Sequence, residues 1–114
     1  ITDGLEYAAS DLHEGDSFTQ ENGMSVVYSD GVMLLADRSC LAGSVATCDV
    51  LVRNLYKTVG IPLCDCVKMA SLTPARVVGV DGCKGKIAVG YDADLLLFDE
   101  DINVSAVFVS GKQI

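Results

Sequence analysis

The sequence predicts a small α+β fold, with strands toward both ends and helices between them. A hairpin pattern occupies residues 24–36, apolar residues at helical spacing occupy residues 48–59, and glycine-punctuated apolar runs occupy residues 84–114. Strands and helices that are grouped along a chain in this way are typical of α+β proteins. A chain of 114 residues is long enough for one domain, so we expect a single hydrophobic core.

The N-terminal part predicts a strand end, a loop and a hairpin. Residues 1–4 suit the last residues of a strand and its turn, which places Asp3 at the end of that strand. Residues 5–22 are rich in small and acidic types and predict an irregular acidic loop. Asp30 and Gly31 then separate two apolar runs, and an Asp-Gly pair readily supplies the positive φ angles of a two-residue hairpin turn.

A stretch of small residues, residues 40–49, connects the hairpin to the helices. Its Ala42, Gly43 and Ser44 carry little side-chain bulk, so a ligand can approach the main chain and meet its N–H and C=O groups directly. The simpler interpretation is a tight connection at the start of a helix. Spacing alone does not separate the two interpretations.

Three short helices are predicted after this stretch. The first is expected to be capped by Thr47 and to end at Gly60, and the second to begin at Pro62. The third is expected to be capped by Thr73 and to end at Gly79. The apolar positions that predict the first two helices are Cys48, Leu51, Val52, Leu55 and Val59, followed by Leu63, Cys66, Val67 and Ala70.

The last part of the chain predicts β-strands separated by glycine turns. Residues 95–98 form a continuous apolar run, which suits a strand that is covered on both faces. Asp92 and Asp94 precede this run and could serve a metal ion or acid–base chemistry. The simpler interpretation is that one or both aspartates form hydrogen bonds in the turn before the strand.

Composition excludes some partners and suggests another. The formal net charge is −8, with only eight Lys and Arg residues, which argues against a nucleic-acid surface. No apolar run reaches the length of a membrane span, about 18 residues, so no membrane partner is expected. Counted with the 11 glycines and without the 4 tyrosines, the hydrophobic residues make up about 56 % of the chain, above the usual value of about 45–50 %. We therefore expect part of the surface to be covered by another subunit or by the rest of a larger chain.

The five cysteines predict reduced thiols in a cytoplasmic protein, because they are odd in number and include no C-x-x-C pair. A zinc site built from the pair in residues 64–66 together with His13 is not expected, since alternate positions on a helix point apart. Burial as small apolar side chains is expected instead. The cysteines are Cys40, Cys48, Cys64, Cys66 and Cys83.

Several blocks of the sequence, taken together, carry a family resemblance. They are Thr2 with Asp3, residues 41–44 after the hairpin, Asp49 with Arg53 and Asn54, residues 69–75, and residues 84–87 with Gly90 and residues 92–95. In this combination the chain resembles the C-terminal third of the N-acetylglucosamine-6-phosphate deacetylases. The last two blocks occur throughout the amidohydrolase superfamily, whereas the Leu-Ala-Gly-Ser block narrows the resemblance to the deacetylases. Gly4 and residues 5–18 depart from the family's pattern.

The resemblance implies an architecture. Residues 1–79 would form the C-terminal end of a metal-dependent (β/α)8 TIM barrel, with its last strand, the hairpin and the three helices. Residues 80–114 would supply the C-terminal strands of a small composite β-sandwich. Catalytic residues of such barrels lie at the C-terminal ends of the strands, which is where Asp3 is expected.

The resemblance also implies an activity, the hydrolysis of N-acetylglucosamine 6-phosphate to glucosamine 6-phosphate and acetate in amino-sugar catabolism. Asp3 would act as general base toward a metal-bound water and then as general acid toward the leaving amine. The loop residues Leu41, Ala42 and Gly43 would contact the sugar. The cofactor would be a divalent metal (Zn, Fe or Mn).

The family's metal ligands are Glu and His residues of upstream strands, so none of them is expected in this chain. His13 alone cannot replace them, because a catalytic zinc needs about three protein ligands. The 114-residue chain is therefore expected to be inactive alone. Its uncovered apolar surface should favour self-association into a dimer or larger homo-oligomer.

Two other functions remain open at this point. The first is another amidohydrolase, dihydroorotase-like or acting on N-acyl amino acids, which would share only the last two blocks. The second is a non-catalytic α+β interaction module that uses the small-residue loop as a binding surface.

Overall fold

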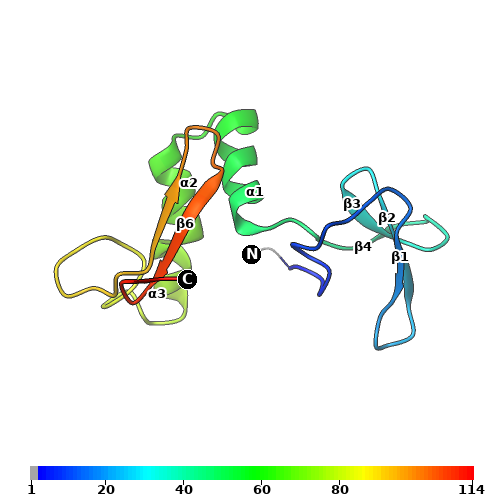
Figure 1. The fold of residues 1–114 in the computed structure, drawn as a ribbon, viewed down its shortest axis with the longest axis horizontal. Helices are drawn as coiled ribbons and strands as arrows, with labels where there is room; N and C mark the ends of the chain where they lie inside the picture. The colour runs from blue at the N-terminus through cyan, green and yellow to red at the C-terminus, as the bar shows by residue number, and fades with distance from the viewer. Residues whose placement is uncertain (1–2) are drawn as a thin grey trace. The chain divides into compact units, whose positions relative to one another are not determined.

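The computed structural model describes residues 3–114 and has the expected mixed α+β composition (Figure 1). The chain forms two compact units, Ile1–Thr47 and Cys48–Ile114. The expectation of a single core is wrong, because each unit buries its own small set of side chains. Val26, Val27 and Met33 are buried in the first unit, and Cys66, Ala75 and Ile102 in the second.

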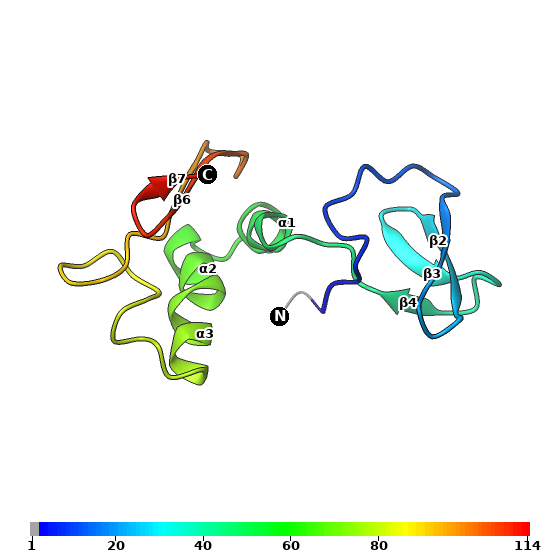
Figure 2. The same ribbon diagram turned by 60° about the horizontal axis from the view of Figure 1, so that its bottom comes forward.

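The first unit is built on a four-stranded antiparallel sheet in the order β1-β2-β3-β4. Its strands are β1 (Ser17–Thr19), β2 (Ser25–Ser29), β3 (Val32–Leu35) and β4 (Leu41–Gly43). Figure 2 shows the same strands from a second direction. Consecutive strands are neighbours throughout, so the sheet is a simple meander that ends at the small-residue stretch.

The predicted hairpin is confirmed between β2 and β3. Ser29 pairs with Val32, and the two residues between them have positive φ angles, 51° at Asp30 and 82° at Gly31. This geometry matches the right-handed twist of the two strands. Gly31 has no Cβ and adopts such a φ without steric cost.

The prediction of an irregular acidic loop is wrong for the end of residues 5–22. Tyr28 donates a 2.7 Å backbone hydrogen bond to Asp16, and Gly15 donates one of 2.9 Å to Tyr28. β1 then continues this pairing along β2. The edge of β2 offers unpaired backbone N–H and C=O groups. The backbone of any residue can form hydrogen bonds with them, so a strand there does not need an apolar sequence.

The second unit begins with one helical segment in two geometries. α1 (Cys48–Arg53) is an α-helix, and η1 (Asn54–Val59) continues it as a π-helix. The predicted end at Gly60 is confirmed, since Gly60 caps the segment in the left-handed conformation. A π turn takes an additional residue and shifts later positions off the 3.6-residue stripe. Val59, predicted on the apolar stripe, is accordingly 65 % exposed.

Two further helices follow, α2 (Leu63–Ala70) and α3 (Leu72–Val77). Pro62 is the N-cap of α2, as predicted. The prediction that Thr73 caps the third helix is wrong, because Ser71 holds that position and α3 follows α2 after this single residue. The helix ends before Gly79, as predicted. No helix within residues 3–114 is long and apolar enough to cross a membrane.

The chain closes with a second antiparallel sheet in the order β5-β6-β7, formed by β5 (Leu95–Phe98), β6 (Val104–Val109) and β7 (Lys112–Gln113). The strand prediction is wrong for residues 84–94, which form turns and irregular chain instead. The expectation that β5 is covered on both faces is also not met in this chain. Its neighbours Leu96 and Leu97, which point to opposite faces, are 54 % and 55 % exposed.

The cysteines are free thiols, and their expected burial holds only for Cys66. The Cys66 thiol lies 3.5 Å from the backbone oxygen of Ile61. The other four cysteines are exposed.

Candidate functional site

The segment that carries Asp3 pairs with the residue that follows β4. Gly4 forms an isolated parallel bridge with Ser44, and the Leu5 amide donates a 2.8 Å hydrogen bond to the Ser44 backbone oxygen. Residues 40 places apart in the sequence thereby become neighbours. The pairing brings the backbone at Asp3 to the end of the predicted sugar-contacting residues, which form the strand β4 and not the predicted loop, because they pair with β3.

Asp3 itself is exposed and has an unusual backbone conformation. Its φ angle is 46°, in the left-handed region that few residues other than glycine adopt. Strained conformations of this kind cluster at active sites and ligand-binding positions. The expected end of a strand at residues 1–3 lies largely outside the described residues, and the bridge at Gly4 is its described part.

β4 carries a β-bulge at the predicted contact residues. Met33 pairs with Gly43 and Leu34 pairs with Leu41, which leaves Ala42 as the additional residue on β4. Bulges of this kind bend a strand and re-aim its groups, and they are frequent beside active sites. Leu41 is 67 % exposed, whereas Ala42 and Gly43 are half-buried.

Gly43 makes the close approach between β4 and the Asp3 segment possible. Its φ angle is 155°, and a Cβ atom built there would lie 2.7 Å from Cγ and 2.8 Å from Cδ2 of Leu5. Any other residue at this position would therefore clash with Leu5. Sequence reasoning missed Leu5, although a glycine in so short a strand is a sign that another segment approaches the backbone closely.

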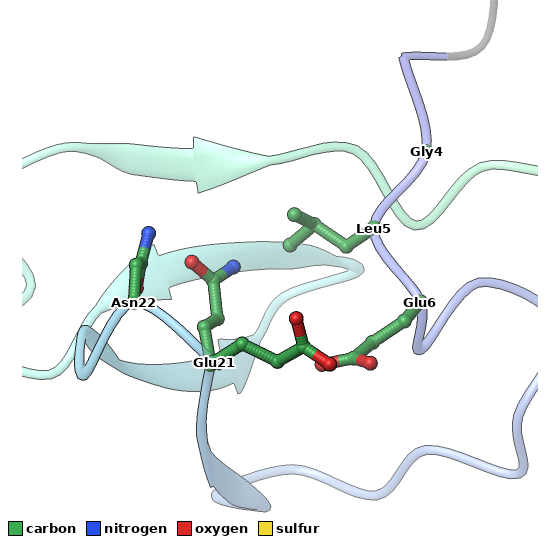
Figure 3. Close-up of a pocket in the computed structure, with 6 residues that line it drawn as sticks. Gly4, Leu5, Glu6, Glu21 and Asn22 are labelled. Atoms are coloured by element: carbon green, nitrogen blue, oxygen red, sulfur yellow. The ribbon is translucent and has the colours of Figure 1, made fainter.

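An open hollow of about 420 Å³ lies next to this pairing, on the side of the β1–β2 turn (Figure 3). Four of its six lining residues are polar, and the carboxylates of Glu6 and Glu21 point toward one another across it. Neither Asp3 nor any residue of β4 lines it. The lining residues are Gly4, Leu5, Glu6, Gln20, Glu21 and Asn22.

Asp92 and Asp94 are engaged in the ion pairs of a turn. The Lys84 ammonium lies 2.8 Å from Asp92 and 2.6 Å from Asp94, and the Ser110 amide donates a 2.8 Å hydrogen bond to Asp94. Lys84 is the main cause of the lowered pKa of Asp94. Asp94 thus has a structural role, but the turn to which it is hydrogen-bonded is the one after β6 and not the predicted turn before β5.

The described residues do not fit a catalytic metal. Within residues 3–114, no three His, Cys, Asp or Glu side chains lie close enough together to hold an ion. His13 is exposed and lies 3.8 Å from the single carboxylate of Asp16. The predicted site residues that the structure brings close together are Asp3 and those of β4.

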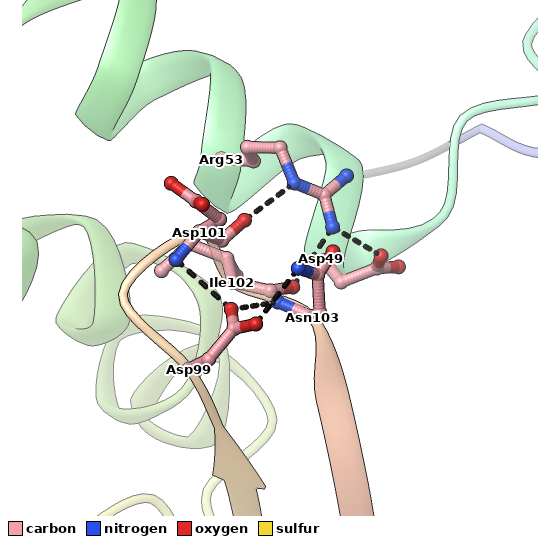
Figure 4. Close-up of polar contacts among 6 residues, drawn as sticks. All are labelled: Asp49, Arg53, Asp99, Asp101, Ile102 and Asn103. Atoms are coloured by element: carbon pink, nitrogen blue, oxygen red, sulfur yellow. Dashed lines mark hydrogen bonds and ion pairs between the residues drawn. The ribbon is translucent and has the colours of Figure 1, made fainter.

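The block of Asp49 and Arg53 has a structural role in the second unit (Figure 4). The Arg53 guanidinium donates hydrogen bonds of 2.8 Å to the backbone oxygens of Asp101 and Ile102, and it pairs with Asp49 at 3.4 Å. Ile102 is almost fully buried. Arg53 therefore fastens the β5–β6 turn to the end of α1.

The same turn is held internally by Asp99. Its carboxylate accepts backbone hydrogen bonds of 2.9 Å from Asp101 and Asn103 and a 2.8 Å bond from the Asn103 side chain. These donors, with Asn103 first, lower the pKa of Asp99. The turn is thus ordered by charge-assisted hydrogen bonds from within and from α1.

Comparison with known proteins finds related enzymes. The chain is 34 % identical to N-acetylglucosamine-6-phosphate deacetylase from Pasteurella multocida, whose crystal structure matches all of it with a TM-score of 0.89 while the chain covers 29 % of that protein. It is 33 % identical to the enzyme of that name from Homo sapiens over 81 % of this chain and 23 % of the relative. N-acetylgalactosamine-6-phosphate deacetylase from Escherichia coli O157:H7 is 34 % identical over 79 % of this chain and 24 % of the relative.

The chain thus spans about a quarter of the length of these two curated relatives. The sequence model of the amidohydrolase family matches it over residues 1–114. A match over its whole length, together with the two relatives and the solved structure, establishes that the chain belongs to the amidohydrolase family.

Proposed function

We propose that this chain is part of an enzyme that hydrolyses the acetamide of N-acetylglucosamine 6-phosphate to glucosamine 6-phosphate and acetate. The observation that carries the proposal is the pairing of Gly4 with Ser44, which brings Asp3 to the end of β4. It joins a candidate proton carrier to a candidate sugar-binding strand. The names of the two N-acetylglucosamine-6-phosphate deacetylases that the chain resembles support the same substrate class.

Asp3 is proposed to move one proton between the two reacting groups. Its carboxylate would accept a proton from the attacking water as the water oxygen bonds to the acetyl carbon. It would return that proton to the nitrogen as the C–N bond breaks, so that acetate and a free amine leave. An exposed carboxylate on a constrained backbone suits this role, because its position is fixed while its oxygens remain accessible.

Leu41, Ala42 and Gly43 are proposed to contact the sugar through their backbone. The bulge leaves Ala42 without a register partner on β3, so its N–H and C=O groups are candidates for hydrogen bonds to sugar hydroxyls. Gly43 has no side chain that would keep a ligand away. These features favour recognition by the main chain over recognition by a charged side chain.

The divalent metal of the family, Zn, Fe or Mn, is proposed to be bound by a longer protein that contains this chain, because residues 3–114 offer no suitable ligand group. The 114-residue chain alone should then release no acetate, whichever of these metals is added. A cytoplasmic location follows as part of the same proposal, from the reduced thiols and the amino-sugar substrate.

The proposed architecture assigns residues 1–79 to the end of a (β/α)8 barrel and residues 80–114 to a small β-sandwich. The exposed apolar residues of β5 support the second assignment, since a sandwich covers one face of such a sheet with a second sheet. The helices α1 to α3, each with one buried or half-buried side, suit the outer layer of a barrel.

Acetate release from N-acetylglucosamine 6-phosphate tests the proposal, with the longest natural reading frame that carries this sequence. Asp3→Asn should lower kcat by about 100-fold or more, because the amide cannot accept the proton. Asp30→Asn is the matched control, as Asp30 is also exposed and has a φ angle of 51°. An Asp3→Asn enzyme with unchanged kcat would exclude the proposed role.

The same assay separates the alternatives. N-acetylgalactosamine 6-phosphate is the second substrate to measure, since one of the relatives carries that name. A higher kcat/KM for N-acetylgalactosamine 6-phosphate would make that epimer the proposed substrate. Turnover of dihydroorotate or of N-acyl amino acids, with none of either sugar phosphate, would favour the other amidohydrolases. A protein that acts on none of these compounds would favour an interaction module.

A further inference from the structure

We infer that Leu5 is a positioning residue for Asp3, acting through its contact with Gly43. This inference rests on the proposed function and adds a residue to it. Leu5 lies in the segment that departs from the family's pattern, and it is two residues from the proposed proton carrier.

Three contacts fix the backbone immediately after Asp3. Gly4 is bridged to Ser44, the Leu5 amide donates its 2.8 Å hydrogen bond to the Ser44 oxygen, and the Leu5 side chain rests on Gly43. The first two contacts fix the distance between the Asp3 segment and the end of β4. The third fixes the rotation of the Asp3 segment about its own axis, because the Leu5 side chain fills the space that a Cβ of Gly43 would need.

The Leu5 side chain is half-buried, whereas Asp3 and Gly4 are exposed. Among residues 3–114 it is therefore the apolar anchor closest in sequence to Asp3. A catalytic group displaced by about 1 Å can lose about 100-fold in rate, so an anchor two residues away can control kcat without touching the substrate. Leu5 also lines the open hollow with Gly4 and Glu6, and its loss would widen that hollow (Figure 3).

Acetate release by variants in the longest natural reading frame tests the inference. Leu5→Ala should lower kcat by about 10- to 100-fold while KM changes by less than about threefold, because orientation is lost and binding is retained. Leu5→Met, which conserves volume, should restore kcat to within about threefold of the wild type. Leu12→Ala is the matched control, since Leu12 is a half-buried leucine of the same segment.

A double variant tests the contact itself. Gly43→Ala should lower kcat sharply, because its new methyl group meets Cγ and Cδ2 of Leu5. Gly43→Ala combined with Leu5→Ala removes those atoms. It should recover about tenfold in kcat over Gly43→Ala alone, a non-additive result expected of residues in contact. Circular dichroism of each variant confirms that the protein is folded.

Failure of the inference differs from failure of the proposed function. If Asp3→Asn abolishes the activity and Leu5→Ala leaves it unchanged, the positioning role of Leu5 is overturned and the proposed function is retained. Additive losses in the double variant would overturn the contact as its mechanism. A wild-type protein that releases no acetate from either sugar phosphate would overturn the proposed function and this inference together.

Discussion

Glu14 and Ser29, fifteen residues apart, are joined by a 2.7 Å hydrogen bond from the serine hydroxyl to the carboxylate Oε1. The second oxygen, Oε2, accepts a 3.0 Å hydrogen bond from the Asp30 amide. Ser29 is 6 % exposed and is the buried polar residue of the hairpin. The carboxylate thus satisfies a buried hydroxyl and ties the segment before β1 to the hairpin turn.

This relationship predicts a pH-dependent contribution to stability. The hydrogen bond from Ser29, followed by that from Asp30, lowers the pKa of Glu14 below its ordinary value of 4.5. The contribution is therefore present above pH 4.5 and is lost as the pH falls through the lower pKa of the folded state. Glu14→Gln should lower Tm at pH 7, and the difference from the wild type should shrink toward about pH 3.

Thermal unfolding followed by circular dichroism at several pH values measures this effect. Glu21→Gln is the control, because Glu21 lies in the same unit and its substitution also removes one carboxylate from the protein. A difference between wild type and Glu14→Gln that stays constant from pH 7 to about pH 3 would contradict the charge-assisted role of Glu14.

The sequence predicted best those features that depend on a few adjacent residues, such as turns and helix ends. The Asp30-Gly31 turn was predictable because the required φ angles are a property of two adjacent residues. Gly60 ended its helix for the same reason. The π geometry of η1 was not predictable, since apolar spacing along a helix does not report which hydrogen bonds the backbone forms.

Several of the failed predictions concern contacts between distant segments. β1 has only three residues, Ser17, Phe18 and Thr19, and it forms because the edge of β2 offers it unpaired backbone groups. Ile87 and Val89 resemble strand residues, but they are almost fully exposed and no strand of the described chain pairs with them. At the candidate site, the family resemblance supplied Asp3 and residues 41–43. Gly43 indicates that some segment approaches β4 closely, but the sequence does not show that this segment carries Leu5.

Arg53 provides a second prediction, for the stability of the second unit. Its guanidinium donates to the oxygens of both Asp101 and Ile102, an arrangement that the single ammonium of lysine cannot reproduce. Arg53→Lys should therefore destabilise the protein by about 1.5–3 kcal/mol, the range for hydrogen bonds to a charged group. Urea unfolding followed by circular dichroism measures the loss.

Arg76→Lys is the control for this substitution. Arg76 forms a single ion pair with Asp81 at 3.7 Å and is largely exposed, so lysine should replace it with little change in the free energy of unfolding. Equal effects of the two substitutions would show that the hydrogen bonds to the β5–β6 turn do not carry the stability of this unit.

The exposed faces of the second sheet predict that the 114-residue chain self-associates when it is alone. Leu96 and Leu97 expose apolar surface on opposite faces of β5, and burial of such surface is favourable by about 25 cal/mol per Å². Light scattering over a concentration series should give a mass above that of one chain, and Leu96→Lys should lower it. Thr58→Lys, on an exposed residue of η1, makes the same change in net charge without removing an apolar side chain and should leave the mass unchanged. A monodisperse monomer at every concentration would show that these faces do not drive association.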